Sequence, residues 1–227
     1  GEVSVDTKPG YGYETDKTAL HILQDFIVPA LIGKTIAEPV HVPALLKYVR
    51  GHQHTKAGME SAVWDAIAKT NDMRLVDLFA HYMPNGHISR GKATVGVSIG
   101  IQPTFEKTLD IITQRLNEGY KRIKLKIKPD WDLELARAVR QRYPDISLML
   151  DANSAYTLAD ADHLQQMDDL NLLMIEQPLA YSDIYEHAEL NNLMRTPICL
   201  DESMKSNHDL LIALKLGAID ILNLKPI

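Results

Sequence analysis

The sequence predicts an α/β fold of the (β/α) barrel type, present as six strands and preceded by a mainly helical region. Two observations lead to this prediction. From residue 93 onward, short apolar runs alternate with amphipathic stretches of helical length, a pattern typical of buried parallel strands joined by crossover helices. In addition, charged residues end five consecutive apolar runs at intervals of 25, 25, 25 and 24 residues, so one structural unit repeats along the chain.

Residues 1–92 are expected to form a separate, mainly helical part. Apolar residues at helical spacing predict helices over residues 16–32, 43–48 and 55–69. Gly33 directly follows the first of them and suits a helix C-cap. Residues 81–92 are polar and rich in proline and glycine, which predicts a linker. We therefore divide the chain into residues 1–92 and 93–227.

Residues 93–227 contain the repeated strand and helix units. The predicted strands are 94–101, 122–127, 147–150, 172–175, 198–200 and 219–224. The predicted helices between them are 104–117, 133–142, 158–167, 184–193 and 208–216. The repeating order of strand and helix predicts a parallel sheet.

The five regularly spaced charges favour a barrel over an open sheet. They are Lys126, Asp151, Glu176, Asp201 and Lys225. In a (β/α) barrel the strand C-termini converge on one mouth, whereas an open sheet spreads them along a line. A complete barrel of this kind has eight strands, so we expect either that the chain is truncated or that two strands come from elsewhere. The missing initiator Met likewise suggests that the chain begins within a larger gene product.

Three carboxylates at adjacent strand ends point to a metal site. Asp151, Glu176 and Asp201 would repel one another when brought together, and a divalent cation removes that repulsion. An all-oxygen ligand set selects a hard ion such as Mg²⁺, and zinc would favour histidine or cysteine. The alternative is that each carboxylate forms a separate salt bridge with a neighbouring lysine.

Two lysines share one face of the second predicted strand. Lys124 and Lys126 alternate with Leu125, so both point into the barrel. Crowding and desolvation lower a lysine pKa, which would make such a residue a usable base. The alternative is a solvated edge strand. Lys225 would flank the metal from the far side of the ring.

Two further polar residues follow the strand ends. Asn153 could reach a metal-bound carboxylate or water, although a turn-forming asparagine is at least as good an interpretation. Glu202 points away from Asp201 and could hold a lysine.

Composition excludes several classes of protein. The 227 residues carry a net charge of −6, which disfavours general nucleic-acid binding. Cys199 is the single cysteine, and no cysteine and histidine spacing typical of zinc is present. No apolar run approaches the roughly 20 residues that span a bilayer, and the first residues do not resemble a secretory signal. We expect a cytoplasmic protein with no nucleic-acid or membrane partner.

The strand ends carry five short motifs, which are Lys124-Leu125-Lys126, Leu150-Asp151-Ala152-Asn153, Ile175-Glu176-Gln177-Pro178, Leu200-Asp201-Glu202-Ser203 and Asn223-Leu224-Lys225-Pro226. Considered together with residues 56–65 and 96–100, these motifs resemble the enolase superfamily, in its muconate lactonising enzyme subgroup. Within it, the sequence is most similar to the family of o-succinylbenzoate synthases and N-succinylamino acid (N-acylamino acid) racemases.

The resemblance implies roles for these residues. Asp151, Glu176 and Asp201 would bind Mg²⁺, with Mn²⁺ as a substitute. Lys126 would be the base on one face of a small-molecule carboxylate substrate and Lys225 would act on the other. Lys124 would bind the substrate carboxylate. Residues 1–92 would be part of an α+β capping domain, and homo-oligomerisation is left open.

The resemblance also implies a reaction. A lysine removes the proton alpha to the substrate carboxylate, and the enediolate then loses hydroxide as water to give o-succinylbenzoate for menaquinone biosynthesis. The alternative is racemisation of an N-succinylamino acid, in which the opposite lysine returns the proton. Dipeptide epimerisation, cycloisomerisation or an inactive fragment are further alternatives.

Overall fold

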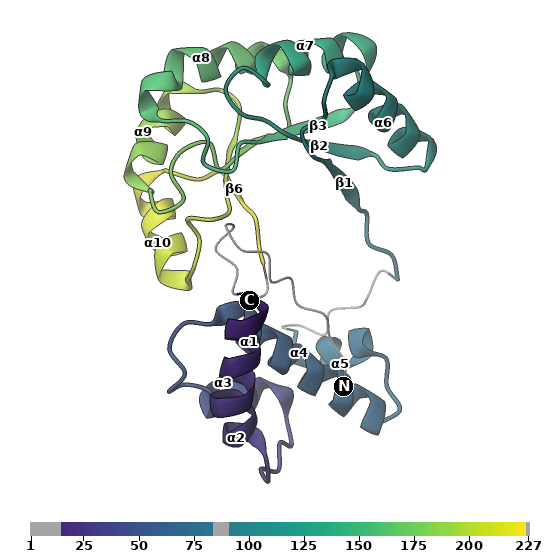
Figure 1. The fold of residues 1–227 in the computed structure, drawn as a ribbon, viewed down its shortest axis with the longest axis vertical. Helices are drawn as coiled ribbons and strands as arrows, with labels where there is room; N and C mark the ends of the chain where they lie inside the picture. Colours follow the sequence, from purple (N-terminus) through teal and green to yellow (C-terminus); the bar gives the residue numbers. More distant parts are fainter. Residues whose placement is uncertain (1–14, 84–90, 226–227) are drawn as a thin grey trace. The chain divides into compact units, whose positions relative to one another are not determined.

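The computed structural model of the protein describes residues 15–83 and 91–225. The chain divides into two compact units, one made of residues 1–93 with 225–227 and the other of residues 94–224 (Figure 1). Within the described ranges, no helix is both long enough and apolar enough to cross a membrane.

The first unit opens with a helix that changes its winding. Thr15 caps α1 (Asp16–Ile22) by accepting a hydrogen bond from the Thr18 N–H. The helix continues through η1 (Leu23–Ile27), a π-helical segment, into α2 (Val28–Leu31). Pro29 has no N–H and its ring clashes with the carbonyl four residues earlier, so the wider turn before it removes the conflict. Gly33 follows at φ +73°, which agrees with the helix end expected there.

Three further helices and one short turn complete this unit. They are η2 (Pro39–His41), α3 (Val42–Leu45), α4 (Gln53–Thr70) and α5 (Leu75–Tyr82). The helix predicted over 43–48 therefore ends at Leu45. The sequence patterns did not predict α5, which Trp64 of α4 stabilises by ring contacts with Phe79 and Tyr82. This helix extends into the predicted linker 81–92, of which residues 84–90 lie outside the described ranges.

The second unit is a parallel sheet whose strands follow one another in chain order. The strands are β1 (Gly96–Ile99), β2 (Arg122–Lys126), β3 (Ser147–Asp151), β4 (Ile175–Glu176), β5 (Ile198–Leu200) and β6 (Ile221–Leu222). The spatial order is β1-β2-β3-β4-β5-β6. A doubly wound sheet reverses its strand order at a switch point, whereas this sheet does not. The six predicted strands and the barrel-type winding are confirmed, although β1, β4 and β6 are shorter than expected.

Helices cover one side of this sheet (Figure 1). They are α6 (Phe105–Asn117), α7 (Leu133–Arg142), η3 (Leu158–Asp160), α8 (Ala161–Gln165), η4 (Gln166–Leu170), α9 (Tyr185–Leu193) and α10 (Asn207–Leu216). Thr104 and Ser206 cap α6 and α10 with side-chain oxygens that accept backbone N–H groups.

Alternation along the strands sends apolar side chains to two separate clusters. Ile123, Leu125 and Leu148 belong to the main core, which includes residues of the covering helices. Met149 belongs to a smaller cluster with Met174, Cys199 and Ile221. Because successive strand residues point to opposite faces, the charged residues that alternate with the main-core residues lie on the same face as Met149.

The first two strands approach each other closely at Gly96. Gly96 pairs with Arg122 in the β1–β2 register. A Cβ at Gly96 would lie 2.5 Å from Arg122 Nε and 3.0 Å from the Arg122 carbonyl oxygen. Only glycine fits this position without displacing Arg122.

Arg140 ties together the segments that enter β3 and β4. Its guanidinium donates to the carbonyl oxygens of Leu170 (2.7 Å), Asn171 (2.8 Å), Pro144 (2.8 Å) and Ile146 (2.9 Å). These carbonyls precede the two strands, so Arg140 holds the sheet at its N-terminal edge, opposite the charged strand ends.

Truncating a main-core side chain should destabilise this unit. Leu148 is fully buried on β3, so we expect Leu148→Ala to lower the free energy of unfolding by about 2–5 kcal/mol through lost burial and a residual cavity. Leu211→Ala on α10 is the control, because Leu211 is 64% exposed and should change stability by about 0.5 kcal/mol or less. Denaturant unfolding measures both, and equal losses would contradict the described core.

Candidate functional site

The three predicted metal ligands lie at the C-terminal ends of neighbouring strands. Asp151 ends β3, Glu176 ends β4, and Asp201 directly follows β5. Asp151 pairs with Glu176 in the parallel register. The three residues are only 1%, 2% and 8% exposed. Water therefore screens these carboxylates poorly, and their charge needs a nearby cation or donor.

The ammonium of Lys124 bridges two of the carboxylates. Its Nζ lies 2.9 Å from Asp151 Oδ2 and 3.0 Å from Glu176 Oε2. Burial lowers the pKa of Lys124, but attraction by Asp151 and then Glu176 outweighs burial and leaves the pKa above its usual value. The expectation that crowding lowers a lysine pKa is therefore wrong for Lys124, which stays an ammonium.

Glu176 has a second polar partner that sequence reasoning missed. Asn223 Nδ2 donates to Glu176 Oε1 at 2.9 Å. Burial, followed by the charge of Asp151, raises the pKa of Glu176 despite Lys124. The alternation of strand residues could have indicated this contact. Asn223 directly follows β6 and lies two residues before Lys225, so it is on the same face as the other strand-end residues.

Lys126 lies at the outer edge of the carboxylate cluster. Its Nζ contacts Asp151 Oδ2 at 2.6 Å and also donates to Asn153 Oδ1. The Lys126 side chain is 30% exposed, compared with 1% for that of Asp151. A group that binds Asp151 and still reaches solvent can meet a substrate, which the buried carboxylates cannot do alone.

Asn153 links Lys126 to Glu202 by hydrogen bonds. Asn153 donates through its backbone N–H to Asp151 Oδ1 at 3.2 Å and through Nδ2 to Glu202 Oε1 at 2.9 Å. Glu202 therefore reaches Lys126 through the Asn153 side chain, and the expectation that Glu202 itself holds a lysine stays a prediction. Glu202 Oε2 is buried without a hydrogen-bond partner among the described residues.

Asp201 lies close enough to Glu176 to help raise its pKa, after burial and Asp151. Within residues 15–83 and 91–225, no group of three His, Cys, Asp or Glu side chains is arranged around one metal-ion position. The donor chemistry still fits a hard dication, because Asp151 and Glu176 are buried carboxylates that already share one ammonium. The three-ligand site stays a prediction.

Lys225 is exposed and follows β6 by three residues. It groups with residues 1–93 and not with the sheet unit. Its predicted position on the opposite flank of the carboxylates therefore stays a prediction.

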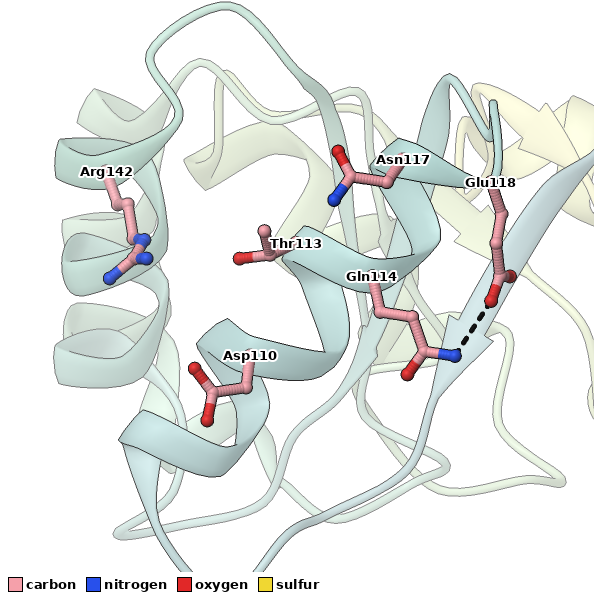
Figure 2. A pocket seen from close by; sticks show the side chains of 6 residues that line it. All are labelled: Asp110, Thr113, Gln114, Asn117, Glu118 and Arg142. Carbon is pink, nitrogen blue, oxygen red and sulfur yellow. Dashed lines mark hydrogen bonds between the residues drawn. The ribbon is translucent and has the colours of Figure 1, made fainter.

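A cavity of about 500 Å³ lies elsewhere on the sheet unit. Figure 2 shows that α6 supplies most of its lining and that Arg142 completes it. Gln114 and Glu118 hydrogen-bond to each other at its edge. None of the strand-end residues lines it, so this cavity is separate from the candidate site.

His187 fixes the loop that follows Glu176. Its ring is fully buried, Nε2 accepts the Leu179 N–H at 3.1 Å, and Nδ1 lies 2.9 Å from Asp183 Oδ2. Nε2 must be unprotonated to accept that hydrogen bond. Burial lowers the pKa of His187, although Asp183 opposes the shift.

Comparison with known proteins gives family and structural similarities. Residues 108–227 match the family model "Enolase C-terminal domain-like", and residues 3–80 match "Mandelate racemase / muconate lactonizing enzyme, N-terminal domain". The chain is 45% identical over 225 residues to the o-succinylbenzoate synthase of Geobacillus kaustophilus, covering 99% of this chain and 58% of that protein. It is 41% identical over 226 residues to the N-succinylamino acid racemase of Thermus thermophilus, covering 100% of this chain and 59% of that protein.

A solved structure is similar over the same span. It is the crystal structure of an unknown member of the enolase superfamily from Enterococcus faecalis. The TM-score is 0.86 at 40% identity, with 98% of this chain and 58% of the other covered. The chain therefore spans a little under three fifths of these relatives.

The buried His187 should make stability depend on pH. The lowered folded-state pKa lies below the value of about 6.5 for an unfolded chain. The contribution of neutral His187 to the free energy of unfolding is present above about pH 6.5. It is lost as the pH falls from there toward the folded-state pKa, because the unfolded chain binds a proton that the folded chain does not. Chemical denaturation between pH 5 and 8 should show a shallower acid decline for His187→Gln than for wild type. His208→Gln is the control, because His208 is exposed. If stability fell with decreasing pH as steeply in His187→Gln as in wild type, His187 would not be the group responsible.

Proposed function

The chain belongs to the enolase superfamily, in the family of o-succinylbenzoate synthases and N-succinylamino acid racemases, and from this membership we propose that its strand-end cluster removes the proton alpha to a substrate carboxylate. The observation that carries the proposal is the pair of buried carboxylates, Asp151 and Glu176, that share one cation beside the partly exposed Lys126.

We assign Asp151, Glu176 and Asp201 as the residues that hold Mg²⁺, or Mn²⁺ in its place. A bound dication supplies Lewis-acid stabilisation of negative charge on the substrate. The all-carboxylate set supports this choice, since hard cations prefer oxygen ligands. Burial and then the charge of Asp151 raise the pKa of Glu176, and a bound cation would offset the repulsion between these carboxylates.

The two lysines of β2 take different roles in this proposal. Lys126 is the base, because it combines contact with Asp151 and exposure to solvent. Asn153 orients it through Oδ1, and Glu202 holds the Asn153 amide. Lys124 remains positively charged and attracts the substrate carboxylate, in agreement with its raised pKa.

The preferred reaction is the o-succinylbenzoate synthase reaction of menaquinone biosynthesis. The carbon–hydrogen bond breaks and its proton passes to Lys126. The carbon–oxygen bond then breaks, and Lys126 gives this proton to the departing hydroxide, which leaves as water. The relative from Geobacillus kaustophilus, at 45% identity, supports this choice. Because the chain spans about 58% of that relative, the reaction is proposed for the natural protein that carries these residues.

N-succinylamino acid racemisation is the second candidate, and the relative from Thermus thermophilus at 41% identity supports it. Both reactions begin with removal of the same type of proton. In the racemase, Lys225 returns a proton to the opposite face. Assays of the natural protein with both substrates decide between them.

Replacing the proposed base, Lys126, should slow removal of the alpha proton. In D₂O, wild-type protein with Mg²⁺ should exchange the alpha proton of an N-succinylamino acid, as followed by loss of its NMR signal. Lys126→Ala should slow this exchange by about 10²–10⁴-fold, the usual contribution of a general base.

The matched control is Lys128→Ala, which removes an exposed lysine just beyond the same strand and should leave exchange unchanged. Full exchange in Lys126→Ala would show that another group is the base. Equal losses in both variants would show that the effect is not specific to Lys126.

A further inference from the structure

Gln177 occupies an unusual position directly after Glu176. It is fully buried and adopts φ +41°, in the left-handed region that residues other than glycine seldom occupy. Such a conformation persists only where surrounding contacts hold it. The contacts of Gln177 are therefore expected to be strong and directed.

The Gln177 side chain uses both ends of its amide. Oε1 accepts the backbone N–H groups of Asp201 (3.0 Å) and Ser203 (3.2 Å). Nε2 donates to Ser203 Oγ at 2.6 Å and to the Ala180 carbonyl oxygen at 3.2 Å. A buried amide with all these partners can adopt only one orientation, so it fixes the backbone that carries Asp201.

The Gln177 backbone links two more segments. Its N–H donates to the Cys199 carbonyl oxygen at 2.8 Å, which continues the β4–β5 pairing. Its carbonyl oxygen accepts the Ser154 N–H at 2.8 Å, next to Asn153. One residue therefore joins the ends of β3, β4 and β5, each of which carries one of the three strand-end carboxylates.

We propose that Gln177 is a positioning residue that holds Asp201 at the correct distance from Glu176 for the carboxylates to bind one divalent cation. This inference rests on the proposed function. Residues that orient metal ligands through hydrogen bonds typically contribute 10–100-fold to metal affinity. Gln177 acts through the Asp201 backbone and contacts neither substrate nor metal.

The test is calorimetric titration of the natural protein with Mg²⁺, comparing wild type with Gln177→Met. Methionine has a similar length and no amide, so it removes all five side-chain hydrogen bonds of Gln177, including a longer one to the Leu179 carbonyl oxygen. We expect Gln177→Met to raise the Kd for Mg²⁺ by about 10–100-fold. In the metal-free protein, we also expect faster hydrogen exchange at the Asp201 and Ser203 amides.

Arg140→Met is the matched control. Arg140 joins loops by a similar number of hydrogen bonds, but at the opposite edge of the same strands. It should lower stability and leave the Kd for Mg²⁺ within about 2-fold of wild type. Gln177→Glu is the conservative variant, because it keeps an acceptor oxygen for both N–H groups and should retain their protection from exchange.

The possible outcomes distinguish failure of the Gln177 role from failure of the proposed function. If wild type binds Mg²⁺ and Gln177→Met binds it equally well, or if Arg140→Met weakens binding as much, the role of Gln177 is overturned while the proposed function stands. If wild type binds no divalent cation, the proposed function fails and this inference fails with it. If Gln177→Met does not fold, Ser203→Ala removes one partner of the same amide, and an unchanged Kd there overturns the inference.

Discussion

The confinement of negative charge at the ends of parallel strands is the constraint on which the rest of the site depends. Asp151 and Glu176 are paired by the strand register and almost excluded from solvent. Carboxylates in such a place repel each other and are poorly screened by water. They need a cation, and in this chain the Lys124 ammonium bridges both of them.

That need explains the different environments of neighbouring polar groups. Lys124 is committed to the carboxylates, so its pKa rises, while Lys126 contacts Asp151 from a more exposed position. Asn223, one residue after β6, donates to the Glu176 carboxylate, and Gln177, one residue after β4, accepts the Asp201 backbone N–H. Neutral amides thus hold the Glu176 side chain and the Asp201 backbone, and they add hydrogen bonds without adding further charge.

Regular spacing made much of the sheet unit predictable. Five charges near one period of 25 residues indicated repeated strands, and strand alternation placed Lys124 and Lys126 on one face. The hydrogen bonds of Gln177 and Asn223 were not predictable, because their partners lie 24 and 47 residues away in the sequence. Helix α5 was missed because the Trp64 ring contacts that stabilise it come from another helix. The raised pKa of Lys124 was missed because it depends on two carboxylates outweighing burial.

The most direct test of the central claim is to locate a divalent cation in the natural protein. Crystals soaked in Mn²⁺ give an anomalous-scattering map in which the ion is visible without assumptions about its ligands. We expect one strong peak within about 2.0–2.3 Å of carboxylate oxygens from Asp151, Glu176 and Asp201, with Lys124 displaced from the bridging position. A peak elsewhere, or full occupancy of both carboxylates by Lys124 at saturating Mn²⁺, would contradict it.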